Sequence, residues 1–213
     1  MLNNPAARKV STFVLEPLAR GLLKLHVSPD AVTVVGTLIT CTAALVFFPR
    51  GDFISGVIII AASVIADLLD GTMARLSGRA GPWGNFLDAT LDRVADGCVF
   101  GALVLWSVTY AEPWVTAAAL TCLVGGQVIS YAKARAEAVG ATANVGIAER
   151  AERLIVVLLA AFIAGFGVPY VLPVALVLLA IVSVITVLQR IVVVRRQRRP
   201  QTPDGEQAPQ DNS

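Results

Sequence analysis

Charged residues are scarce in this chain. Aspartate, glutamate, lysine and arginine make up 15% of its 213 residues, whereas hydrophobic residues make up 56%. A soluble domain of this length carries roughly a quarter charged residues. The composition therefore argues against a soluble domain and favours a protein whose apolar residues face lipid.

Histidine and cysteine are also rare, which argues against several common kinds of site. There is one histidine, and the three cysteines (Cys41, Cys98 and Cys122) lack metal-ligand spacing, so we interpret them as small apolar fillers. The first 30 residues contain neither a continuous apolar segment nor a cleavage site of small residues. A cleavable signal peptide is therefore not expected.

The chain does contain long runs without charge. Residues 31–49, 113–132 and 154–189 are free of charge, and the last run is long enough for two spans separated by a turn. Two shorter runs, 53–66 and 97–111, reach spanning length only if they extend through acidic segments. We predict six transmembrane helices, at about 31–49, 54–76, 85–110, 113–137, 150–168 and 170–194.

The segments that flank these spans predict the topology and the domain organisation. Basic residues concentrate on one side of the predicted spans, which places both termini in the cytoplasm of a multi-pass cell (plasma) membrane protein. Residues 6–25 mix basic and apolar residues like an amphipathic helix on the membrane surface, interrupted or kinked at Pro17. The predicted fold is thus an all-α integral membrane protein with six transmembrane helices after an amphipathic surface helix. We expect a juxtamembrane segment (1–28), a six-helix domain (29–195) and a disordered cytoplasmic tail (196–213).

Acidic residues lie in or at the edge of the second and third predicted spans, where a carboxylate is costly. Asp67 and Asp70 are three apart, and Asp88 and Asp92 are four apart, so each pair shares one helix face. Because a short loop joins the two spans, we expect them to be antiparallel neighbours with converging carboxylates. Asp96 continues the second face, and we interpret it as a buried polar group bonded to a neighbouring helix.

Converging carboxylates repel one another and stay ionised together only if cations lie among them. Oxygen ligands suit Mg²⁺, Mn²⁺ or Ca²⁺ rather than zinc. Two such ions can clamp a phosphoryl group during displacement. Gly71, Ala74 and Gly84 leave room for a close ligand, and Arg75 could meet a phosphate.

These residues form a pattern that resembles the signature of the CDP-alcohol phosphatidyltransferases, D-x2-D-G-x2-A-R followed after a short gap by G-x3-D-x3-D. All eight fixed positions are present, from Asp67 to Asp92. The resemblance implies that Asp67, Asp70 and Asp88 hold a first metal ion and that Asp70, Asp88 and Asp92 contact a second. It also implies Mg²⁺ as the cofactor, with Mn²⁺ as an alternative, and Asp92 as the general base.

The resemblance further implies which residues bind the CDP-lipid, CDP-diacylglycerol. The segment around Pro29 is similar to the family's P-[ND]-x-[VIL]-T sequence, which lies against the nucleotide. The expected CDP-lipid ligands are Asp30, Ala31, Val32, Thr33, Gly71, Arg75 and Gly81. A homodimer is expected from the family alone, and no nucleic-acid partner is expected.

Basic residues at the cytoplasmic ends of the last three spans suggest an acceptor alcohol that itself carries phosphate. The expected acceptor-phosphate ligands are Ser130, Lys133, Arg153 and Arg190. This group resembles that of the actinobacterial phosphatidylinositol phosphate synthases, which implies inositol 1-phosphate as the acceptor. The stretch around Ser130 is also similar to phosphatidylglycerol phosphate synthases, so glycerol 3-phosphate remains an alternative.

A cation transporter is the alternative from another class, because acids within a membrane also mark ion paths. A transport path places its acids near the middle of the membrane, often at broken helices in two related halves. The acids of this chain cluster instead at one cytoplasmic depth, and no internal repeat is evident. The pattern therefore favours a phosphatidyltransferase.

Overall fold

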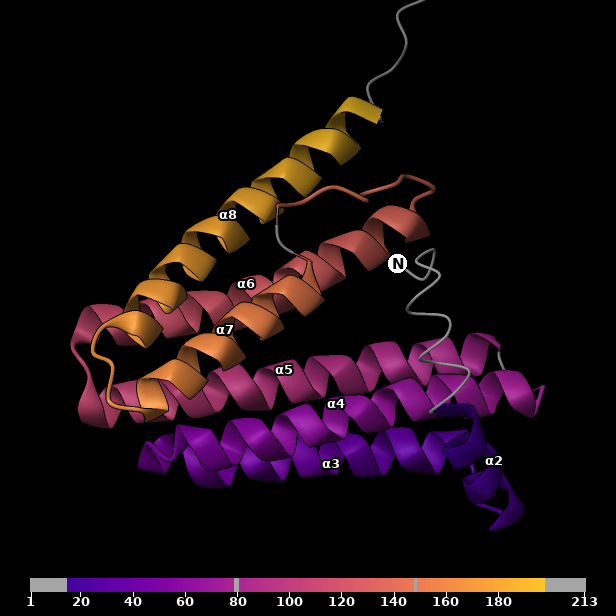
Figure 1. Ribbon diagram of the computed structural model, residues 1–213. Helices are drawn as coiled ribbons and strands as arrows, with labels where there is room; N and C mark the ends of the chain where they lie inside the picture. The colour runs from indigo at the N-terminus through magenta and orange to yellow at the C-terminus, as the bar shows by residue number, and fades with distance from the viewer. Residues whose placement is uncertain (1–14, 79–80, 148, 198–213) are drawn as a thin grey trace, which may run out of the picture.

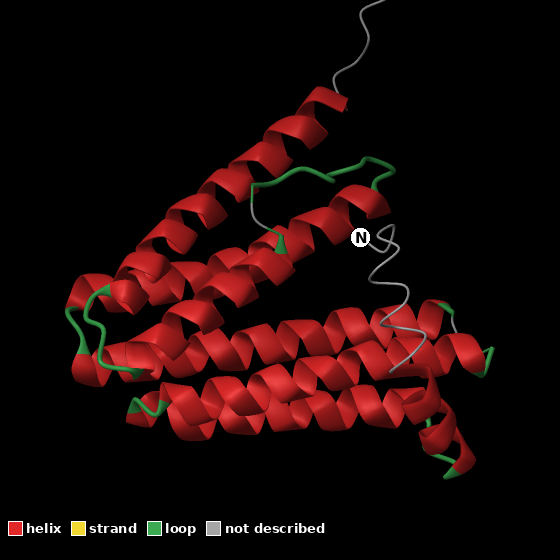
Figure 2. Ribbon diagram, viewed as in Figure 1, coloured by secondary structure: helices red, strands yellow, loops and turns green. Residues whose placement is uncertain are grey.

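The computed structural model describes residues 15–78, 81–147 and 149–197, except for the side chains of residues 65–67. Within these residues every regular element is a helix (Figure 2). The elements are α2 (Glu16–Lys24), α3 (Pro29–Phe47), the short 3₁₀ helix η2 (Phe48–Arg50), α4 (Phe53–Leu76), α5 (Pro82–Tyr110), α6 (Pro113–Ala138), α7 (Arg150–Gly165) and α8 (Val171–Gln197).

The six predicted long helices are present as α3 to α8, with ends within a few residues of the expected positions. Local chemistry explains several of these ends. The Ser28 hydroxyl accepts a 3.2 Å hydrogen bond from the Ala31 amide and so caps the start of α3. At the start of α7, the Glu149 amide donates a 2.7 Å hydrogen bond to the Glu152 side chain in a capping box.

Four of the described helices are long and apolar enough to cross a membrane: Pro29–Arg50, Phe53–Leu76, Pro113–Ala138 and Val171–Gln197. The other two long helices, α5 and α7, are not among these candidate spans, each for its own reason. The first half of α5 carries Asp88, Asp92, Arg93 and Asp96, and α7 has only 16 residues. Large apolar side chains are exposed over the outside of the bundle, as expected for a surface that faces lipid.

The predicted amphipathic N-terminal helix is described only in part, since residues 1–14 lie outside the described residues. Helix α2 packs against α4, with Ala19 fully buried and Leu18 exposed. Pro17 lies in the first turn of α2, where its missing N–H removes no helical hydrogen bond. Pro17 therefore does not interrupt the described helix.

Most of the predicted C-terminal tail (196–213) also lies outside the described residues, from residue 198 onward. Helix α8 extends to Gln197, two residues into the predicted tail. The Gln197 side chain explains this extension, because it accepts a 2.9 Å hydrogen bond from the Thr142 amide and donates a 2.8 Å bond to the Thr142 carbonyl. The end of α8 is thereby tied to the loop between α6 and α7.

Helix α3 packs against both α4 and α5, and the three run alongside one another in Figure 1. We expected α4 and α5 to be direct neighbours, but in the described residues each packs more closely against α3 than against the other. Polar side chains of α3 contribute to its packing against α4. Thr40 lies 2.6 Å from the Ser63 hydroxyl of α4, and Thr33 also bonds to α4. The short loop makes α4 and α5 antiparallel without forcing them into close packing.

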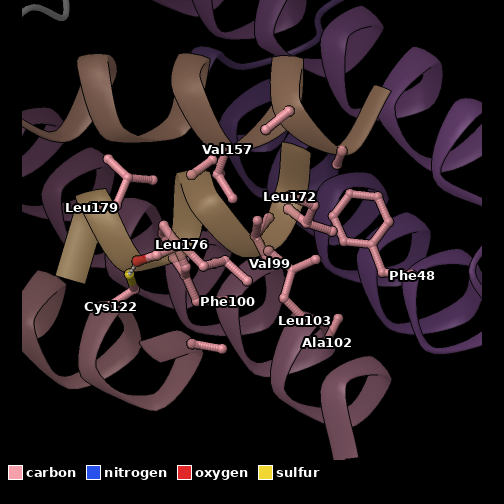
Figure 3. Packing of buried hydrophobic residues seen from close by; sticks show 14 of the residues in the cluster. Phe48, Val99, Phe100, Ala102, Leu103, Cys122, Val157, Leu172, Leu176 and Leu179 are labelled. Atoms are coloured by element: carbon pink, nitrogen blue, oxygen red, sulfur yellow. Dashed lines mark hydrogen bonds between the residues drawn. The ribbon is translucent and has the colours of Figure 1, made fainter. Parts of the chain in front are cut away.

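The apolar core lies toward the end of the bundle that contains the α3–α4 and α7–α8 turns (Figures 1 and 3). Val99, Phe100 and Leu103 of α5 pack there with Leu172 and Leu176 of α8. This core holds the second half of α5 in place. The first half of α5, with its carboxylates, is left to form a polar site at the opposite end.

Candidate active site

The predicted site residues come from several helices, toward the end of the bundle opposite the α3–α4 and α7–α8 turns (Figure 1). This end contains the start of α3, the last turns of α4 and the first turns of α5. The predicted metal ligand Asp67 lies in α4, but its side chain is outside the described part of the chain. The other three predicted ligands, Asp70, Asp88 and Asp92, are described.

Asp70 is buried between α4 and α3, with 9% of the residue exposed. Its Oδ2 atom accepts a 2.5 Å hydrogen bond from the hydroxyl of Thr33, which is 8% exposed. Thr33 was predicted as part of the CDP-lipid site and Asp70 as a metal ligand. The hydrogen bond joins these two predicted sites into one structural unit.

The carboxylate of Asp88 is near enough to interact electrostatically with both Asp70 and Asp92. Asp92 also has a cationic partner, since its Oδ1 atom lies 2.8 Å from Nη1 of Arg150 on α7. Neither Asp70 nor Asp88 forms an ion pair with the lysines and arginines in the described ranges. Their mutual repulsion is therefore compensated less than that of Asp92.

A divalent cation suits these uncompensated carboxylates, because they supply the hard oxygen ligands that Mg²⁺ and Mn²⁺ prefer. Among the side chains that the structure describes, no three acidic, histidine or cysteine residues lie close enough to form a complete metal site. The side chain of Asp67 is not among them. The two-metal site therefore stays a prediction, with which the donor chemistry of Asp70 and Asp88 is compatible.

The predicted CDP-lipid ligands lie at the same end of the bundle, on three helices. Asp30, Ala31, Val32 and Thr33 lie in the first turns of α3, Gly71 and Arg75 in the last turns of α4, and Gly81 is the N-cap of α5. A Cβ atom at Gly81 or Gly84 would meet nothing within 4 Å, and one at Gly71 would approach only Nη1 of Arg75, at 3.8 Å. A ligand could therefore approach all three glycines closely.

Two contacts hold polar side chains near these glycines. The Trp83 indole donates a 3.0 Å hydrogen bond to Oδ2 of Asp30, which links the start of α5 to the start of α3. Nη2 of Arg75 donates a 3.0 Å hydrogen bond to the Thr72 hydroxyl. Because Arg75 is otherwise exposed, most of its guanidinium donors remain available to a phosphate.

A cavity of about 980 Å³ lies between α5, α6 and the ends of α7 and α8. One side contains Asp88 and Asp92, and the other contains Ser130, Lys133 and Arg190. Three of the four predicted acceptor ligands therefore line the same cavity as the predicted general base. This arrangement can receive a molecule that carries both a hydroxyl group and a phosphate.

The two predicted acceptor arginines have different surroundings. Arg190 is held by two backbone carbonyls, with its Nε atom 3.0 Å from the Val145 oxygen and its Nη1 atom 2.5 Å from the Ile129 oxygen. Its Nη2 group makes no protein hydrogen bond among the described residues. Arg153 is only 2% exposed and is not among the described residues that line the cavity. Its Nη2 atom lies 3.7 Å from Oδ2 of Asp96, so we place Arg153 behind the cavity wall.

Sequence reasoning missed two arginines that line the cavity, Arg93 and Arg150. Arg93 donates a hydrogen bond to the Ser130 hydroxyl, and Arg150 pairs with Asp92. A signal for Arg93 was present, since it is a basic residue within the acidic segment of a predicted span. In the sequence, Arg150 looks like an ordinary basic residue that flanks a membrane span on its cytoplasmic side. Only the folded structure shows that it lines the cavity and contacts Asp92.

The interpretation of Asp96 as a buried polar group bonded to a neighbouring helix is confirmed. Asp96 is 3% exposed, and its Oδ1 atom lies 3.1 Å from Nε of Arg150 on α7. The Asp96 carboxylate also lies near Arg153, which is on α7 like Arg150. Asp96 thus connects α5 to α7 directly behind Asp92.

Residues 26–188 match the family model described as CDP-alcohol phosphatidyltransferase. The chain is 49% identical over 202 residues to the phosphatidylinositol phosphate synthase of Streptomyces avermitilis, an alignment that covers 91% of this chain and 83% of that protein. It is 49% identical over 183 residues to the phosphatidylinositol phosphate synthase of Mycobacterium marinum, with 84% and 78% of the two chains covered.

The fold is similar to crystal structures of Mycobacterium tuberculosis phosphatidylinositol phosphate synthase. The complex of that protein with manganese and citrate has a TM-score of 0.83 and 42% sequence identity, and the match covers 91% of this chain and 94% of that one. The form with CDP-DAG bound has a TM-score of 0.82 and 42% identity, with 92% and 99% of the chains covered.

Proposed function

The chain belongs to the CDP-alcohol phosphatidyltransferase family, and we propose that it transfers the phosphatidyl group of CDP-diacylglycerol to inositol 1-phosphate. The products are phosphatidylinositol phosphate and CMP. The observation that carries this proposal is the cavity in which Asp88 and Asp92 face Lys133 and Arg190. A phosphorylated alcohol fits such a cavity, because its hydroxyl can lie beside the carboxylates and its phosphate beside the cations.

The identity of the acceptor is supported by the relatives. Proteins that are 44% to 49% identical to this chain are named phosphatidylinositol phosphate synthases, and inositol 1-phosphate carries the hydroxyl and phosphate that the cavity suits. Glycerol 3-phosphate carries the same two groups and is the alternative acceptor. Membership of a phosphatidyltransferase family removes the reason for considering a cation transporter.

For the cofactor, we propose two divalent ions, Mg²⁺ or Mn²⁺. Asp67, Asp70 and Asp88 would hold the first ion, and Asp70, Asp88 and Asp92 would contact the second. The manganese in the M. tuberculosis structure and the uncompensated charges of Asp70 and Asp88 in this chain support this proposal. When bound, such ions neutralise the charge of a pyrophosphate and stabilise the departing phosphate.

For the donor, we propose that CDP-diacylglycerol lies against the start of α3 and the glycines of α4 and α5. Gly71 and Gly81 allow its pyrophosphate to approach the backbone, and Arg75 offers guanidinium donors to a phosphate. Asp30, Ala31, Val32 and Thr33 border the nucleotide. The bound CDP-DAG in the M. tuberculosis structure supports this placement.

The proposed reaction is a single displacement. Asp92 removes the proton from the acceptor hydroxyl, whose oxygen then forms a bond to the lipid-side phosphorus of CDP-diacylglycerol. The bond from this phosphorus to the bridging oxygen breaks, and CMP leaves with the electron pair. Lys133, Arg190 and the Ser130 hydroxyl hold the acceptor's phosphate, while Arg153 supports the wall behind them. The family motif contains no serine, cysteine or histidine that could act as a nucleophile.

The protein is a multi-pass membrane protein with four described helices that can cross the bilayer by length and composition. We propose that α5 and α7 also cross it, shielded by the other helices, in a catalytic domain that spans residues 29–195. The distribution of basic residues supports a cell-membrane orientation with both termini and the active site in the cytoplasm. The juxtamembrane role of residues 1–28, the cytoplasmic tail from residue 196 and a homodimer are further parts of this proposal.

The experiment that tests the proposed function is an acceptor competition. Purified protein receives CDP-diacylglycerol, Mg²⁺ and equal concentrations of inositol 1-phosphate, glycerol 3-phosphate, inositol and serine, and the lipid products are identified by mass spectrometry. We expect phosphatidylinositol phosphate to dominate. Phosphatidylglycerol phosphate as the main product would reject the inositol assignment, and no acceptor-dependent release of CMP would reject phosphatidyl transfer.

A further inference from the structure

Asp96 lies one helical turn beyond Asp92 on α5 and is surrounded by three arginines. Its Oδ1 atom is 3.1 Å from Nε of Arg150. Its Oδ2 atom is 3.7 Å from Nη2 of Arg153 and 3.9 Å from Nη2 of Arg93. The side chains of Asp96 and Arg153 are only 4% and 2% exposed, whereas those of Arg150 and Arg93 are 28% and 25% exposed, so the cluster reaches from the interior to the cavity.

The cluster is costly, because burying ion pairs removes charges from water and often contributes little to stability. Within this cluster, the Arg150 guanidinium contacts both Asp96 and Asp92. Its Nε atom faces Asp96 at 3.1 Å, while Nη1 of the same guanidinium faces Oδ1 of Asp92 at 2.8 Å. Since the guanidinium is planar and rigid, the position of the Asp96 carboxylate determines how Arg150 meets Asp92.

The two oxygens of Asp92 have different surroundings as a result. Oδ1 lies 2.8 Å from Nη1 of Arg150, whereas Oδ2 accepts no hydrogen bond within the described part of the chain and lies 3.9 Å from Nη2 of Arg93. That distance is too long for a hydrogen bond. One oxygen is therefore anchored, and the other is free to accept a proton from a molecule in the cavity.

We propose that Asp96 is a positioning residue that acts through Arg150 to orient the free oxygen of Asp92 toward the acceptor hydroxyl. The inference rests on the proposed function, because it takes Asp92 as the general base. Asp92 and Arg150 are among the described residues that line the cavity, and Asp96 is not. Asp96 therefore acts without touching the substrates.

The test compares Asp96→Asn, Arg150→Lys and the double variant with the wild-type protein. Asp96→Asn removes the charge that holds Arg150, and Arg150→Lys keeps a positive charge but cannot bridge two carboxylates with a planar fork. Each single variant should lower kcat by about 10- to 100-fold, as expected when an orienting partner of a reactive group is lost. For Asp96→Asn, the KM values for both substrates, and CDP-diacylglycerol binding measured directly, should change less than about twofold because Asp96 touches neither substrate.

The double variant distinguishes positioning from general support of the fold. If Asp96 acts through Arg150, the second substitution adds little to the loss caused by the first, whereas independent effects multiply. Ser107→Ala is the matched control, because Ser107 is a fully buried polar residue of the same helix at the opposite end. This control should leave kcat unchanged.

If Asp96→Asn does not fold, Asp96→Glu replaces it, because it keeps the charge and displaces the carboxylate by one methylene. It should lower kcat without changing the melting temperature by more than the control does. Undiminished kcat in folded Asp96 variants, or multiplicative losses in the double variant, would overturn the positioning role. Neither result affects the proposed function, which the acceptor competition with the wild-type protein tests separately.

Discussion

Thr33 of α3 donates a 2.5 Å hydrogen bond to Oδ2 of Asp70 on α4. Both residues are more than nine-tenths buried, and they lie 37 positions apart in the chain. This contact connects the helix that begins with the expected nucleotide-binding segment to the helix that carries the first half of the acidic motif. A substrate bound at α3 and a metal bound at Asp70 would therefore influence each other through one side chain.

The first prediction concerns this contact. Thr33→Val preserves the shape of the side chain but removes the hydroxyl donor, which leaves Asp70 without its described partner. A hydrogen bond to a charged group contributes about 1.5–3 kcal/mol, so the apparent Mg²⁺ affinity should change by about 10- to 100-fold. Titration of activity against Mg²⁺ measures this shift. Thr33→Ser should remain near wild type, and an unchanged Mg²⁺ dependence in Thr33→Val would show that this hydrogen bond does not orient Asp70.

The second prediction concerns metal dependence. Chelation with EDTA should abolish CMP release, and added Mg²⁺ should restore it. Asp88→Asn should abolish activity even with saturating Mg²⁺, because it removes a proposed ligand of both ions. The melting temperature of Asp88→Asn should stay close to that of the wild type, since Asp88 is exposed and forms no described ion pair. Near-normal turnover in EDTA would contradict the metal-site proposal.

The third prediction concerns the acceptor. Lys133 lines the cavity opposite the carboxylates, and a charge-assisted hydrogen bond contributes about 1.5–3 kcal/mol. Lys133→Ala should therefore raise the KM for inositol 1-phosphate by about 10- to 100-fold, with little change in CDP-diacylglycerol binding. Arg135→Ala is the control, because Arg135 is an exposed residue of the same helix and is not among the described cavity residues. Equal weakening of CDP-diacylglycerol binding by Lys133→Ala would place Lys133 in the donor site.

The fourth prediction concerns the packing of α6 against α8, which forms the far side of the cavity. A Cβ atom at Gly125 would lie 2.9 Å from Cβ of Ser183, so Gly125→Ala should destabilise the protein by about 1–3 kcal/mol through overpacking. Gly101→Ala is the matched control, since a Cβ at this helical position of α5 meets nothing within 4 Å. Thermal unfolding in detergent compares the two. An equal melting temperature for both variants would show that α6 and α8 can move apart at this position without a loss in the free energy of unfolding.

Much of the fold and of the site could be predicted from the sequence, for identifiable physical reasons. Uncharged runs bounded by proline, glycine and polar residues mark the helix ends, as Ser28 and Pro29 do for α3. Aspartates are costly in apolar spans, so Asp70 and Asp92 are conspicuous in the sequence. These signals are local, so they can be recognised without knowledge of the tertiary structure.

The rest depends on how each helix is rotated and what packs between its neighbours. The sequence does not reveal that α3 packs more closely against α4 and α5 than those two helices pack against each other. Arg150 and Arg153 look equivalent as basic flanks of one span, yet Arg150 lines the cavity and Arg153 is buried behind it. That difference follows from their positions around α7, which place the two side chains on different sides of Asp96.

Direct transfer from CDP-diacylglycerol to inositol 1-phosphate is tested most directly by the stereochemistry at the transferred phosphorus. The measurement uses a donor that is chiral at the lipid-side phosphorus and determines the configuration of that phosphorus in the phosphatidylinositol phosphate product. A single displacement at this site predicts inversion. Retention of configuration, or exchange of labelled CMP into CDP-diacylglycerol without any acceptor, would contradict direct transfer and indicate a covalent phosphatidyl-enzyme intermediate.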